Sequence, residues 1–144
     1  MTVLAAPPQT EAVRRVSRRT VVASTWLFAV LCYLYCDVLG FYDPQDLREI
    51  LAGRAGDIEI TDTFLLGAAV LMTIPISMVL ISRIAPHAFA RWATVSAAAV
   101  MTVVQAGSLF VGSGVTPAYA YFSVIEIATT AFLVVYALRW RAAD

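Results

Sequence analysis

Four apolar runs, each long enough to cross a lipid bilayer as a helix, fill most of this chain of 144 residues. They lie near residues 20–41, 63–82, 92–112 and 118–138. About 20 mostly apolar residues span the hydrocarbon core as an α-helix, which hydrogen-bonds its own backbone groups there. Charged residues make up 14% of the chain, whereas a soluble domain carries roughly a quarter. The predicted fold class is therefore all-α, an integral membrane four-helix bundle.

The arginines predict the orientation of this bundle. All ten basic side chains are arginine, and the loop between the first two runs holds only Arg48 and Arg54, beside six carboxylates. The other eight flank the runs on the opposite side: Arg14, Arg15, Arg18, Arg19, Arg83, Arg91, Arg139 and Arg141. Basic residues collect on the cytoplasmic side of membrane proteins. We therefore expect a multi-pass protein of the cell membrane with both termini in the cytoplasm. Residues 1–19 would form an arginine-rich, partly disordered tail, and residues 20–141 the membrane domain.

A short amphipathic helix is expected in the first outer loop. Asp43 is a favourable N-cap, Pro44 suits the first helical position, and Asp46 would lie near the positive end of the helix dipole. Leu47 and Ile50 would share one face of this helix. The helix would lie on the outer interface or cap the bundle.

Two features of the apolar runs concern helix packing. Pro75 removes a backbone hydrogen bond and predicts a kink in the second run. In the third run, small residues recur every four positions at Thr94, Ala98, Thr102 and Ala106. Small side chains let helices approach closely in a membrane. We therefore expect this face of the third run to contact another helix.

Polar side chains interrupt the apolar runs at comparable depth. Asp37 lies in the outer half of the first run, and its candidate partners Gln105 and Glu126 lie on the third and fourth runs. A carboxylate at membrane depth usually has a partner and often a function. Helical spacing places hydroxyl groups on the same faces. We expect a polar pocket that opens towards the outer leaflet. Its candidate binding residues are Tyr33, Asp37, Gln105, Ser108, Tyr119, Ser123 and Glu126.

Three roles are compatible with these polar residues. They can form a structural hydrogen-bond network between helices, with Asp37 reaching to the surface. They can line a pocket for a ligand or substrate. They can also relay a proton or an ion, with Glu126 as the group that binds it.

Several other kinds of chemistry are disfavoured. The net charge is zero, so no basic field attracts nucleic acid. Cys32 and Cys36 are four residues apart, unlike a Cys-x-x-Cys redox pair, and are expected to be free thiols. His87 is the only histidine, which excludes a haem held by two histidines of one chain and disfavours a zinc site. We expect no cofactor, no metal and no catalytic residue.

Five stretches carry a resemblance to a known family. They lie at 34–40 (Leu-Tyr-Cys-Asp-Val-Leu-Gly), 47–51 (Leu-Arg-Glu-Ile-Leu), 64–68 (Phe-Leu-Leu-Gly-Ala), 74–80 (Ile-Pro-Ile-Ser-Met-Val-Leu) and 125–130 (Ile-Glu-Ile-Ala-Thr-Thr). In their order along residues 20–140, the chain resembles a group of small four-helix bacterial inner-membrane proteins that share a domain of unknown function. The resemblance implies the topology and implies no activity.

These observations favour a non-enzymatic inner-membrane protein, an accessory or a lipid- or small-molecule-binding module with a polar pocket in its outer half. One alternative is an oligomeric proton-coupled transporter of small molecules that uses Glu126. Another is a membrane oxidoreductase subunit. The expected partners are the lipid bilayer and either a second copy of the chain or a partner membrane protein, with no nucleic acid.

Overall fold

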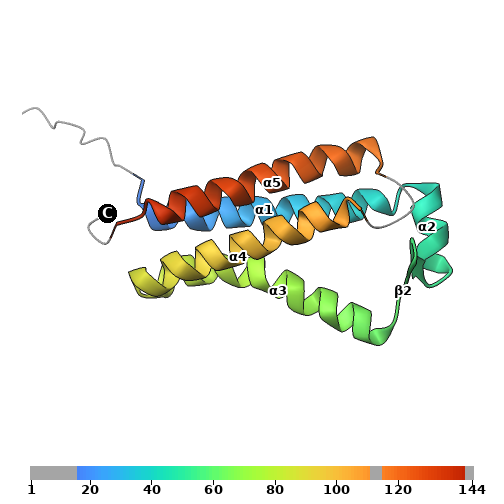
Figure 1. Cartoon of the computed structure of the whole chain (residues 1–144), viewed down its shortest axis with the longest axis horizontal. Coiled ribbons are helices and arrows are strands. Elements are labelled where there is room, and N and C mark those ends of the chain that lie inside the picture. Colours follow the sequence, from blue (N-terminus) through green and yellow to red (C-terminus); the bar gives the residue numbers. More distant parts are fainter. Residues whose placement is uncertain (1–15, 111–114, 142–144) are drawn as a thin grey trace, which may run out of the picture.

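The computed structural model describes residues 16–110 and 115–141, and it is mostly helical. Its four long helices are α1 (Arg18–Gly40), α3 (Asp62–Ile84), α4 (His87–Ser108) and α5 (Pro117–Leu138). The connection between α1 and α3 contains α2 (Pro44–Leu51) and the short strands β1 (Arg54–Ala55) and β2 (Ile58–Glu59). Figure 1 shows α1, α4 and α5 running side by side, with α2 and the strands at one end. Two parts of the predicted elements lie outside the described residues. They are residues 1–15 of the predicted tail and residues 111–112 at the end of the third predicted run.

Polar caps set where the helices begin. Ser17 caps α1, and its side chain accepts a hydrogen bond from the backbone of Thr20. Thr61 and Thr116 cap α3 and α5 in the same way. Asp43 accepts from the backbone of two residues in the first turn of α2. The predicted start of the short helix, with Asp43 as N-cap and Pro44 next, is thus confirmed.

The four long helices pack against one another in pairs, and their core contains both large and small side chains. Among the described residues, α4 contacts α5 and α3, while α1 contacts α3 and α5. Trp26, Met101 and Leu133 are the largest apolar side chains that are fully buried in this core. Thr94 and Ala98 are fully buried as well, so the small-residue face of α4 points inwards as predicted. Small side chains there bring α4 and its neighbours close together.

Arg19 joins the start of α1 to the end of α3. Its Nη1 atom donates to the carbonyl oxygen of Ala85 at 2.7 Å and lies 3.3–3.4 Å from those of Arg83 and Ser82. The last carbonyl groups of a helix lack partners within the helix and carry partial negative charge. A guanidinium group at this position therefore satisfies the end of α3 and fixes it beside α1.

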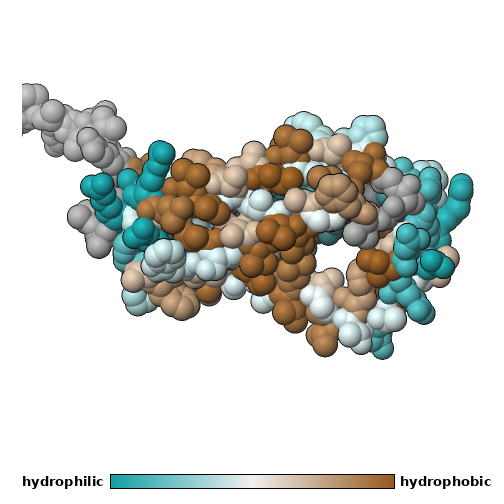
Figure 2. Space-filling view, in the orientation of Figure 1, coloured by the Kyte–Doolittle hydropathy of each residue, from teal (hydrophilic) through white to brown (hydrophobic). Residues whose placement is uncertain are grey.

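The two halves of α3 differ in how they pack. Every buried residue of α3 lies in its second half: Pro75, Met78 and Ser82. In the first half, Leu65 is 53% exposed and Leu66 is 66% exposed. The helix continues through Pro75 without a break, and its first half leans away from the other helices (Figure 1). Figure 2 shows an opening between this half, the strands and the rest of the molecule.

In the part of the chain that the structure describes, three helices are long and apolar enough to cross a membrane: α1, α3 and α5. On the face drawn in Figure 2, hydrophobic residues extend across the middle of the molecule, and hydrophilic residues gather at its two ends. The third expected span corresponds to α4, which is not among the three candidates. Its sequence is rich in alanine and hydroxyl residues and includes Arg91 and Gln105, which lower its mean hydropathy. A fourth crossing helix stays a prediction.

Candidate functional site

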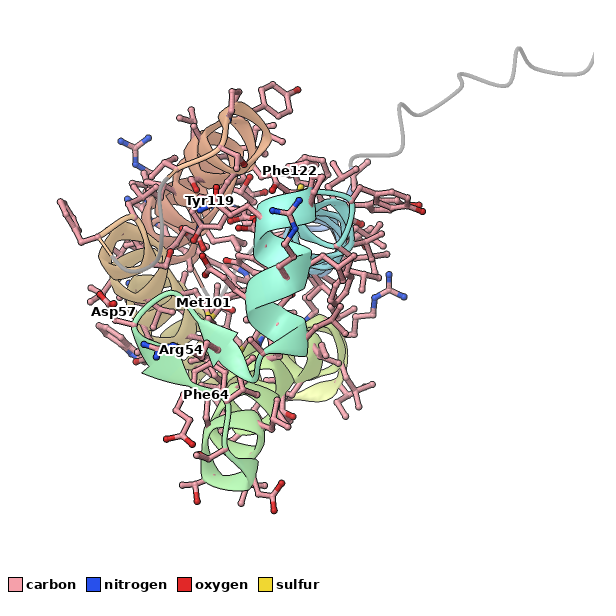
Figure 3. All side chains as sticks on the ribbon, turned by 90° about the vertical axis from the view of Figure 1, so that its right-hand side faces the viewer. Arg54, Asp57, Phe64, Met101, Tyr119 and Phe122 are labelled. Carbon is pink, nitrogen blue, oxygen red and sulfur yellow. The ribbon has the colours of Figure 1, made fainter. Side chains whose placement is uncertain are left out.

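A closed ring of hydrogen bonds joins the outer parts of α4 and α5. The side chain of Gln105 donates through Nε2 to Ser123 Oγ at 2.9 Å, and Ser123 Oγ donates to the carbonyl oxygen of Tyr119 at 2.8 Å. The ring closes through Tyr119 Oη, which donates to Ser108 Oγ at 2.6 Å, and Ser108 Oγ, which donates to the carbonyl oxygen of Gln105 at 2.7 Å. Four predicted site residues are therefore assembled at this one place. Figure 3 looks onto this end of the molecule and labels Tyr119.

A second polar contact joins the same two helices deeper in the bundle. Thr102 Oγ1 and Thr130 Oγ1 are 2.8 Å apart, and Thr130 Oγ1 donates to the carbonyl oxygen of Glu126 at 2.9 Å. Thr130 is buried, and Thr102 is half-buried. The α4–α5 pair is thus held by hydroxyl contacts above and below the level of Glu126. This pairing leaves the Glu126 side chain free to face another helix.

The Glu126 side chain is buried and incompletely satisfied. It is 1% exposed, and its Oε1 atom has no hydrogen-bond partner among the described residues. Its carboxylate interacts electrostatically with Cys32, Tyr33 and Asp37, all of α1. Glu126 therefore reaches from α5 towards α1. A buried polar atom that lacks a hydrogen bond is costly, and such atoms are rare in folded proteins.

Tyr33 and Asp37 form the α1 side of the site. Tyr33 is 6% exposed, and its Oη atom, like Glu126 Oε1, has no partner in the described part of the chain. Asp37 lies on the same face of α1 one turn further out, but it is exposed. Because α1 packs against α3, the lean of α3 uncovers this face towards its outer end. The site is therefore closed at Tyr33 and Glu126 and open at Asp37.

The predicted residues therefore fall into two groups rather than one cluster. Gln105 bonds to Ser123 and makes no described hydrogen bond to either of its expected partners, Asp37 and Glu126. The α4–α5 ring bonds its members to one another, whereas Glu126 of α5 interacts electrostatically with Tyr33 and Asp37 of α1. The sequence pattern placed all these residues at one depth, but it could not show which of them would pair.

Four further buried polar atoms lack a hydrogen-bond partner among the described residues, and the sequence analysis identified none of them: His87 Nε2 and Arg91 Nε near the start of α4, and two atoms deeper in the bundle. The indole Nε1 of Trp26 and the hydroxyl of Thr94 are buried without a hydrogen bond in the described residues. They lie on α1 and α4, in the half of the bundle nearer the arginines. Both residues look like ordinary members of an apolar or small-residue stripe in the sequence. Their position was visible from helical spacing, but their lack of partners was not.

The electrostatics of the site favour a positive or hydrogen-donating group. Glu126 and Asp37 are the two carboxylates of α1, α4 and α5, and no basic side chain lies in the outer halves of these helices. Cys32 and Cys36 beside them are free thiols, as predicted. Within the described ranges, no three His, Cys, Asp or Glu side chains are placed to hold a metal ion together. The arrangement can thus accept a proton, a cation or hydrogen-bond donors.

A comparison with protein families matches residues 14–144, nearly the whole chain, to a family of unknown function, DUF6326. Comparisons with curated proteins and with solved structures gave no match. The family match agrees with the resemblance noted in the sequence and assigns no activity.

Proposed function

The chain belongs to DUF6326, a family of unknown function, and from this premise we propose that it is a bacterial multi-pass inner-membrane protein that binds a small molecule between its helices. In this proposal α1, α3, α4 and α5 each cross the membrane. The protein is a binding module and not an enzyme. Its ligand carries a cationic or hydrogen-donating group on an apolar body.

The outward side chains support a membrane location. Large apolar residues are exposed on every long helix, among them Leu34 on α1, Leu80 on α3 and Val124 on α5. On α4, Val103 is 72% exposed. Contiguous apolar surface of this extent marks contact with lipid or another protein. The outward face of α4 therefore favours a fourth crossing helix, although its inward face is rich in small and polar residues.

The charges at the two ends support the orientation. Six described arginines lie at one end of the molecule. They are found at the beginning of α1, on either side of the connection between α3 and α4, and after the end of α5: Arg18, Arg19, Arg83, Arg91, Arg139 and Arg141. The opposite end, around α2 and the strands, carries six carboxylates and only Arg48 and Arg54. By the positive-inside rule, the arginine end lies in the cytoplasm and both termini are cytoplasmic.

The single observation that carries the binding proposal is the unpartnered Oε1 atom of Glu126. A structural network would satisfy this atom, as the α4–α5 ring satisfies its members. Tyr33 Oη also lacks a hydrogen-bond partner among the described residues, and Asp37, one turn further out on the same face of α1, is exposed. An ammonium or phosphonium group, or a neutral donor, would pair with Glu126. The aromatic ring of Tyr33 would also favour a cation.

Tetraphenylphosphonium and tetraphenylborate test this proposal as a matched pair of opposite charge. We expect the cation to raise the melting temperature of the purified protein in mild detergent, and the anion to have little effect. A ligand at 100 times its Kd stabilises by about 2.7 kcal/mol. Glu126→Gln should abolish the response, while Glu59→Gln, an exposed carboxylate on β2, should keep it. Equal responses of both variants would overturn the proposal.

The same buried carboxylate favours one competing function, proton-coupled transport by an oligomer. Binding and transport are distinguished in liposomes with an imposed pH gradient. Uptake of tetraphenylphosphonium that depends on this gradient, and that Glu126→Gln abolishes, would indicate a transporter. Binding without gradient-driven uptake supports the binding module.

A further inference from the structure

Four arginines surround one pocket at the end of the molecule opposite α2. The pocket has a volume of about 740 Å³, and its lining combines these arginines with one apolar and one aromatic residue: Arg18, Arg91, Leu138, Arg139, Trp140 and Arg141. These residues come from the start of α1, the start of α4 and the end of α5. Three separate elements thus bring guanidinium groups to one place.

Backbone contacts hold two of these guanidinium groups at the pocket. Arg91 Nη2 donates to the carbonyl oxygen of Leu138 at 2.9 Å, and Arg18 Nη1 donates to that of Arg139 at 3.1 Å. A guanidinium group has five N–H donors, so the one described hydrogen bond of Arg91 leaves it capacity for a ligand. The Nε atom of Arg91 is buried and has no described partner. The contacts therefore orient both arginines, and Arg91 keeps a donor for a ligand.

The pocket has one aromatic side, formed by a buried tryptophan, and is lined by positive charges. Trp140 is 2% exposed, packs edge-on against His87 with ring centres 5.0 Å apart, and lies under the guanidinium of Arg19. Among the described residues none that lines the pocket is acidic, and the described carboxylates lie in or next to α2, in or between the strands, at the start of α3, or further out on α1 and α5. An anion with several oxygen atoms would fit this charge and these donors.

An apolar groove of about 560 Å³ runs between α1 and α5 towards the middle of the bundle. Its walls include Thr20, Phe28, Ala128 and Phe132. A stack of side chains connects it to the arginine pocket, because Phe132 stacks on Tyr136 at 5.2 Å and the guanidinium of Arg18 lies 5.3 Å above the Tyr136 ring. The apolar groove and the charged pocket thus lie at the two ends of this stack.

We propose that the arginine pocket and this groove together bind an anionic phospholipid. The phosphate group lies against the guanidinium groups, and one acyl chain lies in the groove. Free phosphate shares the headgroup chemistry but would leave the groove unused. The inference rests on the membrane location in the proposed function and is independent of the Glu126 site.

The test measures lipid binding by the full-length protein in mild detergent, by native mass spectrometry and melting temperature. The probes are phosphatidylglycerol, phosphatidylcholine with the same acyl chains, and inorganic phosphate. We expect tight binding of phosphatidylglycerol only, weakening as salt is added. Arg139→Gln should bind it about fivefold more weakly. Arg83→Gln is the matched control, because Arg83 is exposed at the same end but does not line the pocket.

The groove has its own pair of variants. Ala128→Phe adds a ring at the exposed wall of the groove and should weaken phosphatidylglycerol binding, whereas Val124→Phe, one turn away and outside the groove, should not. Equal binding of phosphatidylglycerol by Arg139→Gln and Arg83→Gln would overturn the proposal that the arginine pocket binds the lipid. Inorganic phosphate binding as tightly as the lipid, or an unaffected Ala128→Phe, would overturn the lipid assignment. Glu126→Gln should bind the lipid normally, which separates this test from that of the proposed function.

Discussion

Asp37 follows Tyr33 by one turn on the same face of α1, yet Tyr33 is 6% exposed and Asp37 is exposed. Residues four apart on a helix lie one above the other, so the difference comes from what covers the face. The second half of α3 covers α1, and the first half leans away. This change along α3 gives the Glu126 site a closed inner end and an open outer end.

The two native cysteines of α1 measure how the coverage of this helix decreases towards its outer end. Cys32 is buried and Cys36 is half-buried on the same helix. In the single-cysteine variants Cys36→Ala and Cys32→Ala, we expect N-ethylmaleimide to modify Cys36 faster than Cys32 in native membranes. Mass spectrometry of timed samples measures both rates. Equal rates, or faster modification of Cys32, would show that α3 packs along the whole of α1.

The small-residue face of α4 should tolerate no added volume. Ala98 is fully buried, so Ala98→Leu should destabilise the protein by about 1–3 kcal/mol through overpacking. Val103→Leu is the control, because Val103 is 72% exposed and the added volume points outwards. Thermal unfolding in detergent compares the two. A similar loss in both variants would contradict the packing of α4.

Arg19 should stabilise the arginine end of the bundle more than its neighbours do. Removing it leaves the carbonyl groups at the end of α3 without a donor and should cost about 1–3 kcal/mol in Arg19→Gln. Arg83→Gln, at an exposed side chain of the same region, should be nearly neutral. Both free energies follow from denaturant unfolding in mixed micelles. If both variants are equally stable, the α1–α3 contact does not depend on Arg19.

Orientation is tested by labelling single cysteines in a background that lacks Cys32 and Cys36. Asp57→Cys lies in the connection between the two strands, and Ala88→Cys lies at the start of α4; both positions are exposed. A membrane-impermeant maleimide should label the first in intact cells and the second only after permeabilisation. Labelling of Ala88→Cys from outside would reverse the proposed topology. Gly53 is a poorer site, because its φ of 74° strains any other residue.

Helix positions were largely predictable, because length and hydropathy define them locally. The second run was expected at 63–82, and α3 spans Asp62–Ile84. The fourth was expected at 118–138, and α5 spans Pro117–Leu138. The cap at Asp43 depends on residues next to the helix and was equally readable.

Contacts between helices that are far apart in the sequence could not be predicted from the spacing of apolar and polar residues. Leu66 and Met78 look alike in an apolar run, so nothing in the sequence indicates that the buried residues of α3 all lie in its second half. Helical spacing placed Gln105, Ser123 and Glu126 at one level, but hydrogen bonding depends on rotations between helices. Gln105 therefore pairs with Ser123, and Glu126 is left facing α1.

The most direct test of the account is an experimental density map of the protein in a lipid nanodisc with tetraphenylphosphonium. We predict density for the cation between α1 and α5, beside the carboxylate of Glu126, with the first half of α3 apart from α1. The same map of Glu126→Gln should lack this density. A wild-type map in which side chains fill the space and Glu126 Oε1 has a protein partner would contradict the binding site.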